Sequence, residues 1–169
     1  LPSKLKEIQN YAFNNCVSLN NIIIPKSLEI AAEYDYASVF AGCISMTDVT
    51  IEDGMATIPN YLFKDCINLR QITIPDSVQT IGAYAFANCT MLKGIIIPAS
   101  VKSVKSSSNR GPFYGCNSLK YVELASGMTE VPDYLLSGCS PVEVVVIPDS
   151  VASIGKYSFA DCKVLQNIT

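Results

Sequence analysis

Apolar residues along this chain recur in a frame that restarts every 23 or 27 residues, always around a cysteine. An apolar residue stands six positions after the cysteine and another stands eight positions after it, as Ile72 and Ile74 follow Cys66. A period of two with many β-branched residues is typical of a short β-strand with one buried face. We therefore predict parallel strands centred near residues 22–24, 49–51, 72–74, 95–97, 122–124 and 145–147, and one more at the chain end.

Two further apolar columns repeat with the cysteines, one three residues before them and one three residues after. The cysteines are Cys16, Cys43, Cys66, Cys89, Cys116, Cys139 and Cys162, and the preceding column is Phe13, Phe40, Phe63, Phe86, Phe113, Leu136 and Phe159. A period of about 20 to 50 residues is typical of a solenoid, whose coils bury their apolar sides against one another. We expect residues 1–169 to form one array of about seven coils, with a larger repeat of 73 residues. The pattern is under way at Leu1 and continues to Thr169, so we expect a segment of a longer protein.

Each predicted strand is followed by a return segment. A proline usually stands nine positions after the cysteine and ends the strand because it has no N–H for the ladder, although Glu52 and Ala125 replace it in two coils. Beyond this position, apolar residues recur every three to five positions, as in Val78, Ile81 and Phe86. That spacing favours a turn and a short helical or 3₁₀ segment. The predicted fold class is therefore an α/β repeat solenoid with short helical or irregular returns.

The phrase C-x-x-L-x-x-I-x-I-P, followed by L/V-x-x-I-x-x-Y-A-F-x-x-C, resembles the BspA-like leucine-rich repeats of bacterial and protist surface proteins. The resemblance extends over the whole chain. It implies a right-handed, horseshoe-like solenoid with a parallel β-sheet on its concave face. It also implies an extracellular or cell-surface protein that adheres to host matrix proteins or to other cells. The repeats around Cys43 and Cys116 depart from the pattern, because each has four extra residues before the phenylalanine.

Composition narrows the classes of function. Apolar residues make up 49% of the chain and charged residues 16%, so the chain must bury a continuous interior. No apolar run approaches the roughly 20 residues that span a bilayer, and a net charge of −3 does not favour nucleic-acid binding. The chain has no histidine, which is the commonest general base and metal ligand. We therefore expect a non-enzymatic protein without a cofactor or a metal.

The recurring cysteine admits several roles: metal ligand, half of a disulfide, nucleophile or packing residue. No C-x-x-C pair is present, and an odd number of cysteines excludes complete intramolecular pairing. Stacked coils would hold neighbouring cysteines about 5 Å apart with parallel side chains, which is poor geometry for a disulfide. We expect buried, reduced cysteines that pack the core, with a disulfide or redox role as the alternative.

Tyrosine forms another column, five residues before the cysteine. Its members are Tyr11, Tyr61, Tyr84, Tyr134 and Tyr157. They predict either a partly buried ladder that packs the return segments or an aromatic recognition stripe. The two long repeats lack this tyrosine and place residues 33–38 and 105–111 on the same flank, where a loop on a rigid scaffold can serve recognition.

Apolar side chains also occupy outward positions of the predicted strands, five and seven residues after the cysteine. Ile96, Tyr121, Val144 and Val146 would lie on the exposed face of the sheet. A contiguous exposed apolar patch is a common protein-contact signal. The alternative is that β-branched residues stand there only because they suit a strand.

Charge is distributed unevenly along the chain. Residues 77–122 contain no Asp or Glu. Four residues after the cysteine, Arg70, Lys93 and Lys120 follow one another in successive coils. These side chains would form a basic strip at the edge of the sheet. The strip predicts either a site for an anionic ligand or a solvated edge without a binding role.

Together these patterns predict a non-enzymatic module that binds a protein or an anionic glycan on the exposed face of its sheet. The family resemblance implies that this face is concave and that the module serves adhesion at a cell surface. The candidate ligand-binding residues are Arg70, Lys93, Ile96, Lys120, Tyr121, Val144 and Val146. The segments 33–38 and 105–111 are the next candidates. The alternative function is a passive structural spacer, or a self-associating array that displays other domains.

Overall fold

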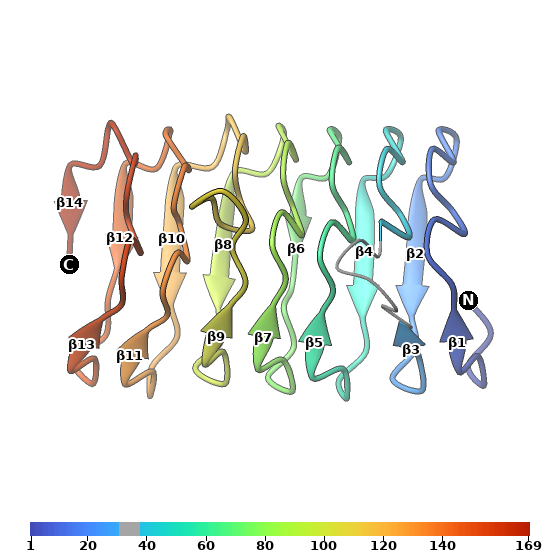
Figure 1. The fold of residues 1–169 in the computed structure, drawn as a ribbon, viewed down its shortest axis with the longest axis horizontal. Coiled ribbons are helices and arrows are strands. Elements are labelled where there is room, and N and C mark those ends of the chain that lie inside the picture. The colour runs from blue at the N-terminus through green and yellow to red at the C-terminus, as the bar shows by residue number, and fades with distance from the viewer. Residues whose placement is uncertain (31–37) are drawn as a thin grey trace.

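A computed structural model of the chain describes residues 1–30 and 38–169 as a stack of coils. In the view of Figure 1 the coils follow one another along a nearly straight line, with the termini at opposite ends. One column of parallel strands runs through the stack: β2 (Asn21–Ile24), β4 (Asp48–Ile51), β6 (Gln71–Ile72), β8 (Gly94–Ile97), β10 (Tyr121–Leu124), β12 (Val144–Val146) and β14 (Asn167–Ile168). These strands lie where the alternating pattern predicts them, so the parallel solenoid is confirmed.

The return segments contain a second column of strands, each two residues long. These are β1 (Glu7–Ile8), β3 (Glu29–Ile30), β5 (Thr57–Ile58), β7 (Thr80–Ile81), β9 (Ser103–Val104), β11 (Glu130–Val131) and β13 (Ser153–Ile154). They also pair in parallel, as β1–β3, β5–β7–β9 and β11–β13. The described residues contain no helix, so the expected α/β class and the helical form of the returns are not confirmed. Of the two forms expected, helical or irregular, the described returns are irregular, with turns and short strands. Consequently none of the described segments could cross a membrane as a helix.

Hydrogen bonding explains why the returns are not helical. The N–H groups of Phe63 and Asp65 donate to the carbonyl oxygens of Ala85 and Ala87 in the next coil, both at 2.8 Å. The N–H of Cys66 instead closes a tight turn onto the Phe63 carbonyl at 3.2 Å. An α-helix would need these N–H groups for carbonyls four residues earlier in the same segment. The spacing of the apolar residues fits both arrangements, and bonding between coils decides between them.

The residue before each cysteine adopts a positive φ, which turns the chain sharply at the same point of every coil. These residues are Asn15, Gly42, Asp65, Asn88, Gly115, Gly138 and Asp161, with φ between 57° and 80°. Asn, Asp and Gly are the types that tolerate this left-handed region best. The restriction to these three types is visible in the sequence and marks the turn.

The core consists of side-chain ladders that run along the stack. The rings of successive phenylalanines stack with centroids 5.3 to 5.9 Å apart. The cysteines lie beside them, all of them free; five are fully buried, whereas Cys16 and Cys162 in the end coils are half-buried. The Sγ–H of Cys66 donates to the Phe40 carbonyl at 3.2 Å, and four other coils repeat this bond. The predicted role of the cysteines in packing is confirmed.

Candidate binding groove

The outward side chains of the strand column from β2 to β14 form one exposed surface, which we call the sheet face. Along each strand, outward residues alternate with buried ones. In β8, Ile95 and Ile97 are buried whereas Ile96 is 55% exposed, and Tyr121 at the start of β10 is 42% exposed. Two large apolar side chains are thus presented to solvent on neighbouring strands.

The strand register arranges the predicted apolar residues in two rows. Across β8, β10 and β12 the rows are Gly94–Tyr121–Val144 and Ile96–Glu123–Val146. Val144 and Val146 are half-buried, so they present less surface than Ile96. The carboxylate of Glu123 stands between Ile96 and Val146, so the apolar surface predicted from the sequence is interrupted by a negative charge.

The strand column is divided in two: β2, β4 and β6 form one ladder, and β8, β10, β12 and β14 form another. Where a residue other than proline follows a strand, its N–H extends the ladder, as Ala125 does by donating to the Ile97 carbonyl at 2.9 Å. Pro75 and Pro98 stand at this position, nine residues after the cysteine, in two successive coils and have no N–H to donate. Among the described residues no ladder joins β6 to β8. Pro148 stands at the equivalent position after β12 and the β10–β12 ladder is nevertheless formed, so a missing N–H does not by itself break the sheet.

Behind this break the two coils remain joined. The rings of Phe63 and Phe86 stack with centroids 5.8 Å apart, and the Cys89 thiol donates to the Phe63 carbonyl at 3.3 Å. The N–H of Met91 donates to the Ile67 carbonyl at 3.1 Å. The core therefore stays closed behind the missing ladder, and a surface groove spans this part of the sheet side.

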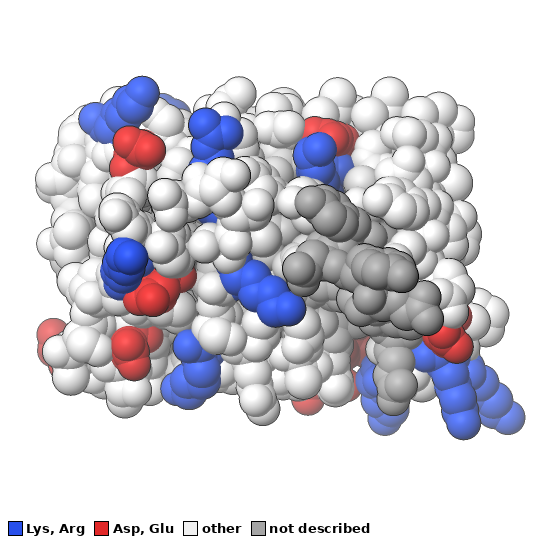
Figure 2. Space-filling view, in the orientation of Figure 1, with Lys and Arg blue, Asp and Glu red and all other residues white. Residues whose placement is uncertain are grey.

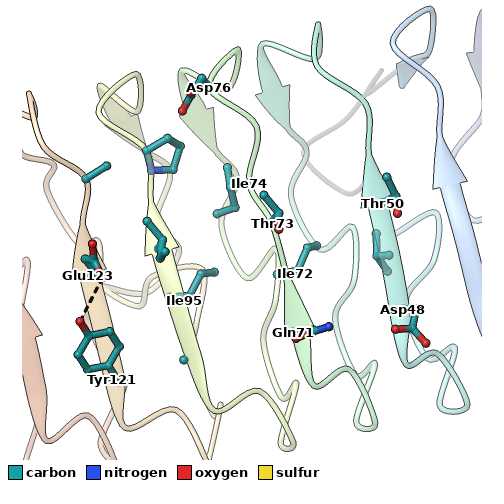
Figure 3. A pocket seen from close by; sticks show the side chains of 15 residues that line it. Asp48, Thr50, Gln71, Ile72, Thr73, Ile74, Asp76, Ile95, Tyr121 and Glu123 are labelled. Carbon is teal, nitrogen blue, oxygen red and sulfur yellow. Dashed lines mark hydrogen bonds between the residues drawn. The ribbon is translucent and has the colours of Figure 1, made fainter.

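The groove has a volume of about 670 Å³ and is lined from β4, β6, β8 and β10, as Figure 3 shows. Ligand pockets in proteins typically measure about 300–1,000 Å³. Ile96 and Tyr121 supply apolar and aromatic surface, and Gln71 and Thr73 supply polar groups. Of the predicted site residues, the groove brings Ile96 and Tyr121 together and leaves out the two valines.

The lining of the groove is acidic. Three of its residues are carboxylates, Asp48, Asp76 and Glu123. None of the described residues that line the groove is a lysine or an arginine. In Figure 3, Asp48 and Glu123 lie on opposite sides of the groove and Asp76 lies beyond the end of β6. The Tyr121 hydroxyl donates to Glu123 Oε2 at 3.1 Å, and this hydrogen bond raises the pKa of Tyr121. The phenol therefore keeps its proton, and the pair is held together on one wall.

The basic residues predicted for the site lie outside the groove. Arg70, Lys93 and Lys120 are exposed, each one residue before β6, β8 and β10 respectively. Lys120 Nζ lies 2.7 Å from Glu143 Oε1, so this ion pair partly neutralises the strip. Arg70 borders a smaller pocket, of about 410 Å³, that it shares with Asp48. The strip and the groove are neighbours of opposite charge, and an anionic ligand on the strip stays a prediction.

The structure describes the long-repeat segment 105–111 but little of the segment 33–38. The segment 33–38 falls almost wholly outside the described residues. The segment 105–111 contains a tight hairpin, in which the backbone groups of Ser107 and Arg110 exchange hydrogen bonds of 3.2 and 2.9 Å. The Arg110 guanidinium lies 4.2 Å from the ring centroid of Tyr114, which holds the hairpin against the stack.

The tyrosine column lies on the return side of the stack. Tyr61 and Tyr84 stack at 5.4 Å between centroids, and Tyr134 and Tyr157 stack at 5.3 Å. These contacts support the packing interpretation. Figure 2 shows the face on which return segments pass in front of the sheet strands, and there charged side chains of both signs are scattered among large uncharged areas. The sheet face is the candidate for binding because it carries the groove.

The buried thiols are not suited to nucleophilic chemistry. Burial raises the pKa of the Cys66 and Cys116 thiols to about 12, so both stay protonated at neutral pH. Within the part of the chain that the structure describes, no group of His, Cys, Asp and Glu is close enough to hold a metal ion. The groove and the sheet face around it are thus the surface whose geometry fits binding.

The acidic character of the groove was not predicted from the sequence. Asp48 and Glu123 stand at outward strand positions, so the sequence predicts that each is exposed but not that they line one groove. Asp76 follows Pro75, in the turn after β6. Pro75 and Pro98, in successive coils, are a sequence feature that coincides with the missing ladder.

Comparison with known proteins identifies relatives of the whole chain. The profile of the family described as BspA type Leucine rich repeat region, in six copies, matches residues 1–111 and 109–169. A solved leucine-rich repeat protein of T. pallidum, TpLRR, is 29% identical with a TM-score of 0.75, over 99% of this chain and 77% of that one. One from Bacteroides ovatus is 30% identical with a TM-score of 0.73, over 96% of this chain and 40% of that one.

A third solved structure, the pneumococcal vaccine antigen PcpA, shares the fold at 19% identity, with a TM-score of 0.64 over 92% of this chain and 40% of that one. No curated protein matches the chain. The chain spans less than half the length of the Bacteroides ovatus and pneumococcal proteins, so their complete architectures extend beyond the part compared.

Proposed function

The chain belongs to the family of BspA-type leucine-rich repeats, and we propose that it is a non-enzymatic module that binds another macromolecule through its sheet face. Leucine-rich repeats are a general scaffold for protein interaction, and their fold is typically non-catalytic. The proposed setting is adhesion at a cell surface or outside the cell. The resemblance to BspA-like surface proteins supports that setting.

One observation carries the proposal: Ile96 and Tyr121 stand exposed beside a groove of about 670 Å³ on an otherwise regular sheet. Exposed aromatic and branched apolar side chains around a concave site are the usual source of hot-spot energy in an interface. The rigid ladders behind the face favour binding, because little conformational entropy is lost when a partner docks on a preformed surface.

The basic strip of Arg70, Lys93 and Lys120 extends the proposed site toward the beginning of the strands. It would attract an acidic protein segment or a sulfated glycan, through contacts that weaken as salt concentration rises. Lys93 is the cleaner test of this part, because Lys120 already pairs with Glu143 at 2.7 Å. Reversing the charge at Lys93 and Lys120 should weaken binding to an anionic partner and flatten its salt dependence.

The test is a binding screen of the parent protein against purified matrix proteins, mucin-type glycans and sulfated glycans by biolayer interferometry. Any partner found is then measured against Ile96→Ser and Tyr121→Ser, with Ile44→Ser as the matched control. Ile44 is 41% exposed and lies in the turn after Cys43, off the sheet face.

Loss of at least about fivefold in affinity for both sheet-face variants and not for the control would support the proposal. An equal loss for Ile44→Ser, or full binding by both sheet-face variants, would contradict it. A screen in which no partner binds at all would instead favour the passive structural spacer.

A further inference from the structure

The groove between β6 and β8 has a chemical character that selects among partners. Its three carboxylates come from β4, from the turn after β6 and from β10, so they surround the groove and do not form one cluster. None of Asp48, Asp76 and Glu123 takes part in the ion pairs found among the described residues. Their charges therefore remain available to a cationic group that enters the groove.

The groove also offers surface for the uncharged part of such a group. The side chain of Ile96 is 55% exposed and the ring of Tyr121 is 42% exposed, on adjacent strands. An aliphatic stem can lie against Ile96, and a cationic head can lie over the face of the tyrosine ring. The hydrogen bond of 3.1 Å from the Tyr121 hydroxyl to Glu123 holds an aromatic face and a carboxylate beside each other.

The break in the sheet supplies a third element of recognition. No ladder joins β6 to β8 in the described residues, so the backbone groups on their facing edges are not committed to strand pairing. Carbonyl oxygens along such edges accept hydrogen bonds from a ligand or from water. A flat guanidinium with five N–H donors matches this combination of carboxylates, carbonyl oxygens and an aromatic face better than a compact ammonium does.

From these features we infer that the groove binds an arginine side chain presented by an extended segment of a partner protein. The inference rests on the proposed binding through the sheet face and gives the chemistry of one anchor in that interface. The basic strip beside the groove then restricts the partner further, because the residues that flank the arginine must not be basic. A strongly polybasic segment would be repelled by Lys93 and Arg70.

The probe for this inference is a set of blocked pentapeptides with valine and alanine flanks and a central arginine, lysine, glutamine or glutamate. Each is titrated into the isotopically labelled protein and followed by amide chemical shifts. The arginine peptide should shift the amides of Gly94, Ile96 and Tyr121. The lysine peptide should bind more weakly at the same amides, and the glutamine and glutamate peptides should not bind in the groove.

Three variants locate the contact. Glu123→Gln and Asp76→Asn should each weaken the arginine peptide by about threefold or more, which is what the loss of one partly solvated charge pair produces. Glu130→Gln is the matched control, because Glu130 is an exposed residue of β11 in the return column and its loss changes the net charge equally. Raising the salt from about 50 mM to about 500 mM should weaken the binding of the arginine peptide, because salt screens its attraction to the carboxylates.

Several results would overturn the inference: equal affinity for the arginine and glutamine peptides, equal affinity for arginine and lysine, shifts confined to residues outside the groove, or an equal loss in Glu130→Gln. The outcomes also separate this inference from the proposed function. If Ile96→Ser abolishes binding to a macromolecular partner but no arginine peptide enters the groove, only the inference fails. If the peptide binds as expected but no macromolecule depends on the sheet face, the proposed function fails.

Discussion

Replacing Cys89 with serine should destabilise the protein by about 1–3 kcal/mol, because the substitution buries a hydroxyl that its surroundings cannot satisfy well. The Cys89 side chain has no exposed surface, and its Sγ donates to the Phe63 carbonyl at 3.3 Å. A C–O bond is shorter than a C–S bond, so the serine oxygen would lie farther than this from the carbonyl. Good O–H···O hydrogen bonds span only about 2.5–3.0 Å.

The size of the effect follows from what each replacement loses. The Phe63 carbonyl already accepts from the Cys66 N–H at 3.2 Å, so removing the thiol does not leave this oxygen without a partner. Cys89→Ala should therefore cost only the lost packing of the sulfur, on the order of 1 kcal/mol. Cys89→Ser loses the same packing and also desolvates a hydroxyl, so it should be the less stable of the two.

The assay is urea unfolding followed by circular dichroism, with the midpoint and slope fitted separately. Cys16→Ser serves as the control, because Cys16 is half-buried in an end coil and a hydroxyl there can reach water. Its cost should stay below about 1 kcal/mol. The slope should not change, since the same surface is exposed on unfolding. A serine variant at Cys89 that matches the parent, or that is more stable than Cys89→Ala, would refute the reasoning about the buried hydroxyl.

Three other predictions concern the labelling of the thiols, the pH dependence of stability and the close approach of neighbouring coils. A thiol reagent at neutral pH should label few of the seven cysteines before denaturation and all of them afterwards, whereas rapid labelling of native Cys116 would contradict its burial. The free energy of unfolding should also fall as pH rises from about 9 toward 12. Burial raises the pKa of the Cys116 thiol in the folded state from 9.0 to about 12. The stabilisation that comes from this raised pKa is therefore complete below pH 9 and is lost as pH rises through that window. Urea midpoints at pH 7.5 and pH 10 test this, and Cys116→Ala should lose about 1 kcal/mol less between them than the parent does. Finally, Gly82→Ala should cost about 1–3 kcal/mol, because the new Cβ would collide with the backbone of Pro59 and Asn60 in the preceding coil. In Gly94→Ala the new Cβ would make only ordinary contacts with Tyr121, at 3.4 Å from its carbonyl oxygen and 3.8 Å from its side chain, so stability should change by less than about 0.5 kcal/mol. Equal melting temperatures for the two glycine variants would contradict this account.

The sequence by itself determined the stack of parallel coils, the position of its main strands and the ladders inside it. In a solenoid each residue meets its equivalents in the coils before and after it, so a column in the aligned repeats is already a row of contacts. For that reason the cysteines and phenylalanines could be placed in the core from their spacing alone. The outward residues Ile96 and Tyr121 followed from the same period of two.

Only the tertiary structure decided what depends on how neighbouring coils bond to one another. Whether a return segment is helical depends on the destination of its N–H groups, and Phe63 donates to the next coil at 2.8 Å. The groove is lined from β4, β6, β8 and β10, so no single repeat reveals it. The charge of the site depends on which side chains surround that opening. Asp76 borders the groove whereas Lys120 turns to an ion pair with Glu143, because distance in space and not order in the chain sets which charges interact.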